Sequence, residues 1–173
     1  MPAPTLAGFE VRVVVGIADL VVSNNPGAVL TTYSLGSCLG ISIYDPVVRV
    51  GGLLHIMLPD STIDSAKAMQ KPAMFADTGV PTLFREAYQL QAQKHRMIIC
   101  VAGGAQVMDT TGFFNIGKRN YEAISNLFRQ HNLRIQAEAV GGLVSRSMFL
   151  NLSTGEVKLK ISGQPTDCVL WKS

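Results

Sequence analysis

The first sixty residues carry four short runs of apolar and β-branched residues, each followed by a turn signal. Such runs are typical of strands, and Asn, Asp, Pro and Gly between them are typical of turns. This pattern predicts a β-rich first third and is the strongest constraint on the fold. The predicted strands cover residues 11–22, with a break at Gly16, and residues 28–33, 39–44 and 50–58.

After residue 60 the apolar spacing changes from two residues to three and four. Residues 60–72 are polar and predict a loop, and a helix follows with Asp77 or Thr78 as its N-cap and Pro81 in its first turn. A second helix is predicted for residues 117–130. Strands are predicted at 97–102 and 133–140, and a hairpin at 147–161 that turns at 153–155.

The resulting order, β-β-β-β-α-β-α-β-β-β, predicts an α/β (α+β) sandwich with a mixed, largely antiparallel sheet and two main helices. With 173 residues, 47% of them hydrophobic and 16% charged, the chain is long and apolar enough for one folded domain. We expect residues 1–9 to be a flexible leader and residues 10–173 to be this single domain.

Charge and cysteine usage exclude several classes of function. The net charge is +3, and the basic residues form no stripe with interleaved aromatics, so we expect no nucleic-acid partner. Arg12 and Asp19 interrupt the most apolar early stretch, so we expect no direct membrane insertion. Three widely spaced cysteines predict neither a disulfide framework nor a metal site, and a reduced cytoplasmic setting is the simplest interpretation.

Cys38 and His55 are the residues that most strongly suggest chemistry. Cys38 has Gly36, Ser37 and Gly40 as close neighbours, which leaves its sulfur reachable and backbone amides free. His55 follows seventeen residues later in a predicted strand and is the side-chain type best suited to take a thiol proton near neutral pH. The pair suggests a thiol nucleophile and its base.

Simpler explanations exist for each of these residues. A lone histidine in a strand is more often a buried residue with a backbone partner, and a free cysteine is often a small buried hydrophobe, as we expect of Cys100. We assign no role to Cys168. A hydroxyl of Thr31, Thr32 or Ser34 would suit the orientation of the imidazole, but threonine is also common in strands.

Two segments that could bind an anion are better explained as structural features, one rich in glycine and one beginning with asparagine. Gly103-Gly104-Ala105 follows a predicted strand but lacks the spacing and the lysine of a phosphate-binding loop, so a tight turn is favoured. Asn115 precedes the second helix, where capping is favoured over anion binding.

Taken in order, the motifs of the chain resemble the CheD family of bacterial chemoreceptor glutamine deamidases. The resemblance covers roughly residues 12–160 and includes Asn25-Pro26-Gly27, Thr32, Leu35-Gly36-Ser37-Cys38, Tyr44-Asp45-Pro46, Gly51-Gly52-Leu53-Leu54-His55-Ile56-Met57-Leu58-Pro59, Phe75-Ala76-Asp77-Thr78, Ala102-Gly103-Gly104-Ala105, Asn115-Ile116-Gly117-Lys118-Arg119-Asn120, Gly141-Gly142 and Arg146.

The resemblance implies a cytoplasmic cysteine hydrolase that converts chemoreceptor glutamines to glutamates at receptor arrays. Its fold would be similar to the catalytic domain of the cytotoxic necrotising toxins. The family's nucleophile, histidine and threonine fall on Cys38, His55 and Thr32. Backbone N–H groups of Ser37 and Cys38 would hold the oxyanion, and neither metal nor organic cofactor is expected. The implied partners are methyl-accepting chemoreceptors and a CheC-type phosphatase, with glutamate methyl-ester hydrolysis as a secondary activity.

Two other classes of function stay open at this point. The chain is alternatively a non-catalytic regulator that docks to receptors or to the phosphatase, although a pure scaffold needs no Cys38, His55 and Thr32. A papain-like amidase or transglutaminase ranks last, because the Cys-Trp neighbourhood and the long Cys-to-His separation of those enzymes are absent.

Overall fold

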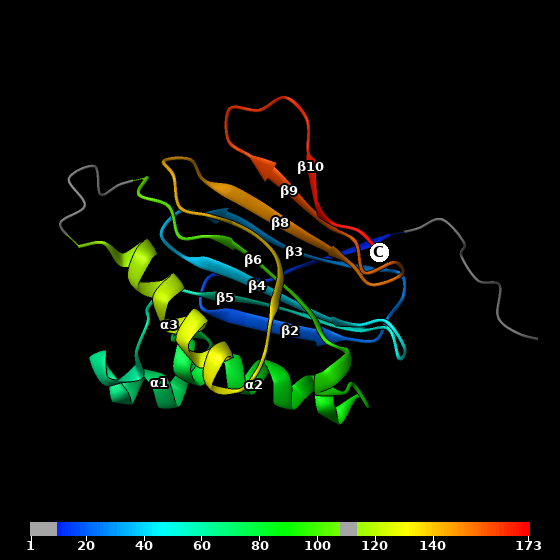
Figure 1. The fold of residues 1–173 in the computed structure, drawn as a ribbon, viewed down its shortest axis with the longest axis horizontal. Helices are drawn as coiled ribbons and strands as arrows, with labels where there is room; N and C mark the ends of the chain where they lie inside the picture. Colours follow the sequence, from blue (N-terminus) through cyan, green and yellow to red (C-terminus); the bar gives the residue numbers. More distant parts are fainter. Residues whose placement is uncertain (1–9, 108–113) are drawn as a thin grey trace, which may run out of the picture.

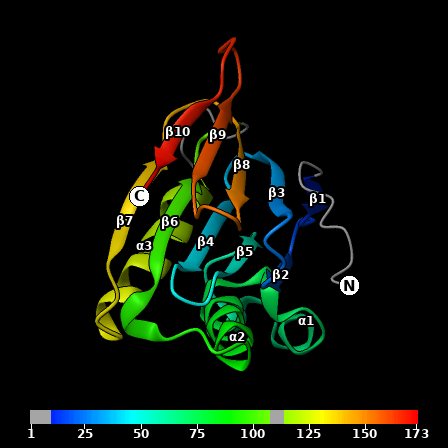
Figure 2. The same cartoon turned by 90° about the vertical axis from the view of Figure 1, so that its right-hand side faces the viewer.

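The computed structural model of the chain describes residues 10–107 and 114–173, so the predicted leader lies outside the described residues. Two β-sheets and a layer of helices are stacked on one another (Figures 1 and 2). The predicted α+β sandwich is therefore confirmed, with three layers. The strands are β1 (Val11–Val14), β2 (Asp19–Ser23), β3 (Ala28–Leu35), β4 (Leu39–Asp45), β5 (Val50–Ile56), β6 (Ile98–Gly103), β7 (Ile135–Val140), β8 (Arg146–Asn151), β9 (Val157–Ile161) and β10 (Cys168–Trp171). The α-helices are α1 (Ser65–Gln70), α2 (Ala76–Gln89) and α3 (Ile116–Gln130).

The strands are divided between two five-stranded sheets. The outer sheet has the order β1-β3-β8-β9-β10, and the central sheet has the order β2-β5-β4-β6-β7. The pairs β1–β3 and β6–β7 are parallel and all other pairs are antiparallel, which confirms the mixed, largely antiparallel prediction. The helices cover the face of the central sheet that is turned away from the outer sheet (Figure 2).

Side-chain alternation along the central sheet separates two apolar cores. Leu54 and Ile56 of β5 pack with α2 and α3 residues in the core beneath the helices. Leu53 belongs to the core between the two sheets, so His55, two residues on, faces the same sheet interface. The β5 strand thus places one histidine among apolar side chains between the sheets.

The predicted strand at residues 11–22 is two strands in two different sheets. The chain turns near Gly16, as expected, and Ala18 has a positive φ of 57°. The β5 strand also ends earlier than predicted, at Ile56, because the Met57 and Leu58 N–H groups both donate to the Met74 carbonyl instead of a neighbouring strand. The end of β5 at Ile56 is relevant to the candidate active site.

The prediction of a loop at residues 60–72 is wrong. Two 3₁₀ turns, at Ser61–Ile63 and Pro72–Met74, flank the short helix α1, whose N-cap Asp64 accepts a hydrogen bond from the Lys67 N–H. Only Ala68 of α1 is buried, so the segment carries no apolar periodicity from which it could have been recognised.

The predicted start of the first long helix is also wrong, and the last strand was missed. Helix α2 begins at Ala76 with Phe75 at its N-cap, and Pro81 lies beyond its first turn. The Asp77 carboxylate accepts from the Ser61 N–H (2.9 Å) and hydroxyl (2.6 Å), so it joins the two segments instead of capping the helix. The unpredicted β10 has four residues at the edge of the outer sheet.

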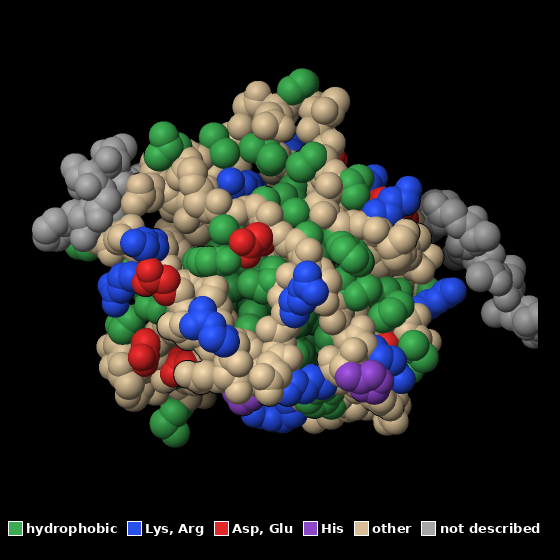
Figure 3. Space-filling model, in the orientation of Figure 1, with side chains coloured by type: hydrophobic (Ala, Val, Ile, Leu, Met, Phe, Trp, Pro, Cys, Tyr) green, Lys and Arg blue, Asp and Glu red, His purple; other side chains and the backbone are tan. Residues whose placement is uncertain are grey.

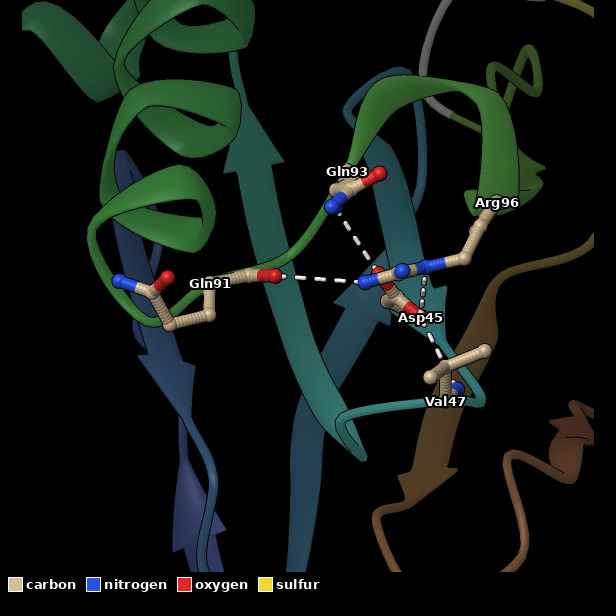
Figure 4. A network of polar contacts seen from close by, with 5 residues as sticks. All are labelled: Asp45, Val47, Gln91, Gln93 and Arg96. Carbon is tan, nitrogen blue, oxygen red and sulfur yellow. Dashed lines mark hydrogen bonds and ion pairs between the residues drawn. The ribbon is translucent and has the colours of Figure 1, made fainter.

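A buried ion pair fixes the end of β4 that lies away from Cys38. The Arg96 Nε donates to both carboxylate oxygens of Asp45 (3.0 and 2.9 Å), and the Gln93 and Val47 N–H groups donate to the same carboxylate (Figure 4). Burial alone would raise the pKa of Asp45, but these hydrogen bonds and the Arg96 charge outweigh it and hold the pKa below its usual range. The network closes the β4–β5 turn onto the segment before β6.

Candidate active site

Cys38 lies at the end of the turn between β3 and β4 and is partly exposed. The Cys38 carbonyl accepts a hydrogen bond from the Gly104 N–H (2.9 Å), and the Gly36 carbonyl accepts one from the Ala105 N–H (2.8 Å). The turn that carries the thiol is therefore held by the segment just after β6. Gly103 ends β6 and residues 104–106 form no turn, so the predicted tight turn at Gly103-Gly104-Ala105 is not observed; the segment lies against the cysteine loop instead.

Gly103 is the position at which this contact requires glycine. It has a φ of +112°, and a Cβ placed on it would collide with the Cys38 carbonyl oxygen. Any larger residue there would push the cysteine loop away from β6.

His55 is completely buried between the sheets, opposite Gly40 of β4. A Cβ on Gly40 would lie 2.9 Å from a Leu35 methyl carbon and 3.0 Å from the Met148 sulfur. Because paired residues in adjacent antiparallel strands project to the same face, this glycine lets the Leu35 and Met148 side chains pack on the face of His55. Cys38, two residues before Gly40, packs against the apolar cluster between the two sheets.

Thr32 of β3 reaches His55 from the opposite sheet. Its Oγ1 lies 2.7 Å from the imidazole Nδ1 and 2.8 Å from the Val15 carbonyl oxygen. Thr31 points to the other face of β3 and pairs with Phe149 of β8. The sheet stacking thus joins Thr32 and His55, which lie 23 residues apart in the sequence.

The partners of Thr32 determine the tautomer of His55. A carbonyl oxygen only accepts hydrogen bonds, so the Thr32 hydroxyl donates its proton to Val15. Its oxygen then accepts from the imidazole, which places the proton of the neutral ring on Nδ1. The other nitrogen, Nε2, keeps its lone pair, and it is buried without a hydrogen-bond partner among the described residues.

Burial favours the neutral forms of both groups. Desolvation lowers the pKa of His55 to about 4. Desolvation also raises the pKa of the Cys38 thiol, although the Cys38 backbone N–H opposes the rise. At neutral pH the resting pair is therefore a thiol and a neutral imidazole, and not a thiolate–imidazolium ion pair.

Asn120 of α3 is a buried polar residue that sequence reasoning did not single out. Its side-chain amide donates to the carbonyl of Ser37 and to the carbonyl of Met57, each at 3.0 Å. The motif around residues 115–120 pointed to this region, but spacing alone does not show that an amide 83 residues away reaches the cysteine loop.

The remaining candidate residues lie outside this arrangement. Cys100 is fully buried and burial raises its pKa to about 11, which confirms its interpretation as a core residue. Asn115 occupies the N-cap position of α3 in a left-handed conformation, but its Oδ1 accepts from Gln106 Nε2 (3.0 Å). Within residues 10–107 and 114–173, no three His, Cys, Asp or Glu side chains are grouped closely enough to hold a metal ion.

A separate apolar groove of about 350 Å³ lies between α2 and α3, away from the thiol. Figure 3 shows Lys and Arg side chains beside apolar ones along the lower edge of the molecule, over α2. None of the residues that line this groove is a Cys, Asp, Glu, Ser or Thr. The lining residues are Val80, Pro81, Phe84, Arg85, Tyr88, Lys94, Leu127, Phe128, His131 and Leu133.

A partly exposed thiol, a buried imidazole with one free nitrogen and a hydroxyl on the other nitrogen are typical of cysteine-dependent hydrolases. Comparison with known proteins identifies the family. Residues 57–161 match the family model described as CheD chemotactic sensory transduction. The chain belongs to the CheD family.

Curated relatives cover nearly the whole chain. A protein of Syntrophus aciditrophicus named "Probable chemoreceptor glutamine deamidase CheD 1" is 51% identical over 153 residues, which are 88% of this chain and 96% of that protein. Relatives with the corresponding name come from Solibacter usitatus, with 45% identity over 91% of this chain and 94% of the relative, and Pyrococcus horikoshii, with 39% identity over 86% and 91%. None of the helices in the described part of the chain is both long and apolar enough to cross a membrane.

Proposed function

We propose that this chain deamidates glutamine side chains of chemoreceptors, with Cys38 as nucleophile, His55 as general base and acid, and Thr32 as the residue that orients His55. The names of the relatives support the substrate. The observation that carries the chemistry is the hydrogen bond between Thr32 Oγ1 and His55 Nδ1, which leaves the Nε2 lone pair unused.

In the first step the thiol loses its proton as it attacks. The Cys38 sulfur forms a bond to the side-chain carbonyl carbon of glutamine, and Nε2 takes the thiol proton. A neutral imidazole is needed for this transfer, and the low pKa of His55 keeps it neutral at physiological pH. The imidazolium that forms is stabilised at Nδ1 by the Thr32 oxygen.

The negative charge that develops on the glutamine oxygen needs nearby donors. Among the described residues, neither the Ser37 nor the Cys38 N–H donates to a carbonyl oxygen. We assign the oxyanion to these two amides, and a donor of this kind contributes about 2.7–4 kcal/mol to the transition state in comparable enzymes.

Three further proton transfers complete the reaction. Nε2 returns its proton to the amide nitrogen, ammonia leaves, and a thioester between Cys38 and the former glutamine remains. Water then gives a proton to Nε2 and attacks the thioester. As the bond between carbon and sulfur breaks, Nε2 passes this proton to the Cys38 sulfur, so that glutamate forms and the thiol is restored. A glutamate methyl ester would follow the same path with methanol as leaving group, which is the basis of the secondary esterase activity.

The test is mass spectrometry of a chemoreceptor cytoplasmic fragment after incubation with the protein. We expect glutamine-to-glutamate conversion at specific sites with the wild-type chain, and none with Cys38→Ala or His55→Asn. Conversion by Cys38→Ala would show that the nucleophile is misassigned. Binding of the fragment without conversion would instead support the non-catalytic regulator. Recruitment to receptor arrays and a CheC-type phosphatase partner stay predictions.

A further inference from the structure

Asn120 makes contacts that the chemistry proposed above does not use. Its side chain is wholly buried, and its Nδ2 donates to the Ser37 and Met57 carbonyls. Ser37 precedes the nucleophile, and Met57 lies two residues beyond His55. One side-chain amide therefore ties together the two backbone segments that carry the thiol and the imidazole.

The position of α3 makes this contact a close one. A Cβ on Gly117, one helical turn before Asn120, would lie 2.5 Å from the Gly104 carbonyl oxygen, so only glycine lets the helix approach this far. The Gly104 N–H in turn donates to the Cys38 carbonyl. Asn120 thus acts from a helix end that rests on the same segment as the cysteine loop.

The oxygen of the Asn120 side-chain amide indicates that this residue does not mainly contribute to stability. The Asn120 Oδ1 is buried and has no hydrogen-bond partner among the described residues. A buried acceptor without a partner is costly, which offsets part of what the two Nδ2 hydrogen bonds contribute. An apolar side chain of similar volume would avoid that cost but would leave Ser37 and Met57 unconnected.

We infer that Asn120 is a positioning residue that sets the approach of the Cys38 thiol to His55 Nε2. Its two side-chain hydrogen bonds go to backbone carbonyls, and the side chain is buried, so it acts through the two loops and not on the substrate. Its effect on deamidation rests on the proposed function, whereas its effect on the reactivity of the thiol does not.

The experiment compares Asn120→Leu with Asn126→Leu, an exposed asparagine further along the same helix. Alkylation of Cys38 by iodoacetamide is followed in the full chain from pH 5 to pH 9 by mass spectrometry of the Cys38 peptide. We expect Asn120→Leu to alkylate at least tenfold more slowly at pH 7, with kcat for deamidation lowered by a similar factor and KM unchanged. Asn126→Leu should match the wild type.

A double variant separates positioning from general loosening of the fold. If Asn120 acts through the Cys38–His55 pair, Asn120→Leu should slow alkylation no further in a His55→Asn background. Equal slowing in both backgrounds, or an unchanged pH profile in Asn120→Leu alone, would overturn the inference. Should Asn120→Leu fail to fold, Asn120→Asp keeps the shape but loses the amide donor when ionised, and the same comparison applies.

The experiments distinguish a failure of this inference from a failure of the proposed function. A wild-type chain that deamidates no receptor, with alkylation that still depends on Asn120, would refute the function and retain the positioning role. Deamidation by the wild type that Asn120→Leu leaves unchanged would retain the function and refute the positioning role.

Discussion

Replacement of His55 by asparagine should remove a specific part of the pH dependence of stability. The imidazole has a pKa of about 4 in the folded protein, against an ordinary value near 6.5. The unfolded chain therefore binds a proton at His55 as pH falls below 6.5, whereas the folded chain does so only near pH 4. Stability is fully present above pH 6.5 and is lost progressively between pH 6.5 and pH 4.

The expected magnitude follows from these two pKa values. Between pH 7 and pH 4.5 the His55 contribution falls by about 2.4 kcal/mol. The asparagine side chain of the His55→Asn variant does not titrate, and its amide still reaches toward the Thr32 oxygen. The variant should be less stable at every pH because it leaves space between the sheets, but it should lack this pH-dependent loss. The difference between the two pH dependences is the quantity to measure.

Urea unfolding at pH 7 and pH 4.5 measures that difference for both proteins. Carboxylates titrate in the same range, but they are shared by the two chains and cancel in the comparison. With a slope of about 2 kcal/mol per molar urea, the wild-type midpoint should fall by about 1 M more than the variant midpoint. Equal shifts would mean that His55 is solvated or already charged in the folded protein, and the neutral-base assignment of Nε2 would be wrong.

Three further substitutions test other parts of the structure. Thr32→Val keeps the shape but removes the acceptor for Nδ1–H, so kcat for deamidation should fall by about 10–100-fold with little change in KM, as steady-state kinetics would show. Gly103→Ala should destabilise by about 2 kcal/mol or more in urea and slow Cys38 alkylation, because its Cβ collides with the Cys38 carbonyl. Asp45→Asn should cost about 3 kcal/mol in unfolding experiments, because Arg96 loses its buried partner, yet leave alkylation at pH 7 unchanged; slowed alkylation would show that this end of β4 affects the site.

Local periodicity was sufficient to predict the elements that bury one clear face. Helix α3 extends from Ile116 to Gln130 against a prediction of 117–130, and the hairpin of β8 and β9 turns where expected, with Gly155 at a positive φ. The division of the strands into two sheets was not predictable, because an alternating strand looks the same whichever sheet it joins. The missed β10 is an edge strand of four residues with little buried surface.

The candidate site was only partly visible in the sequence for a related reason. Cys38 and His55 have chemically distinctive side chains, so their residue types alone drew attention. Asn120 binds backbone carbonyls, which every residue possesses, so nothing in the sequence of its partners marks the contact. The residues alone left Thr31, Thr32 and Ser34 open, and only the family resemblance selected Thr32; in the structure Thr32 lies on the face that meets His55.

Thr32 and His55, two residues of the proposed mechanism, are brought together by packing between layers and not within one element. Cys38 lies in the turn just before β4, and His55 belongs to β5 of the central sheet. Thr32 belongs to the outer sheet and meets His55 across the core between the sheets. The orientation of the imidazole therefore depends on how closely the two sheets pack. The buried apolar residues between them, such as Leu53 and Met148, determine that separation as well as the stability of the domain. A loss of sheet packing would disturb the Thr32–His55 hydrogen bond even while the thiol stays in place in the turn before β4.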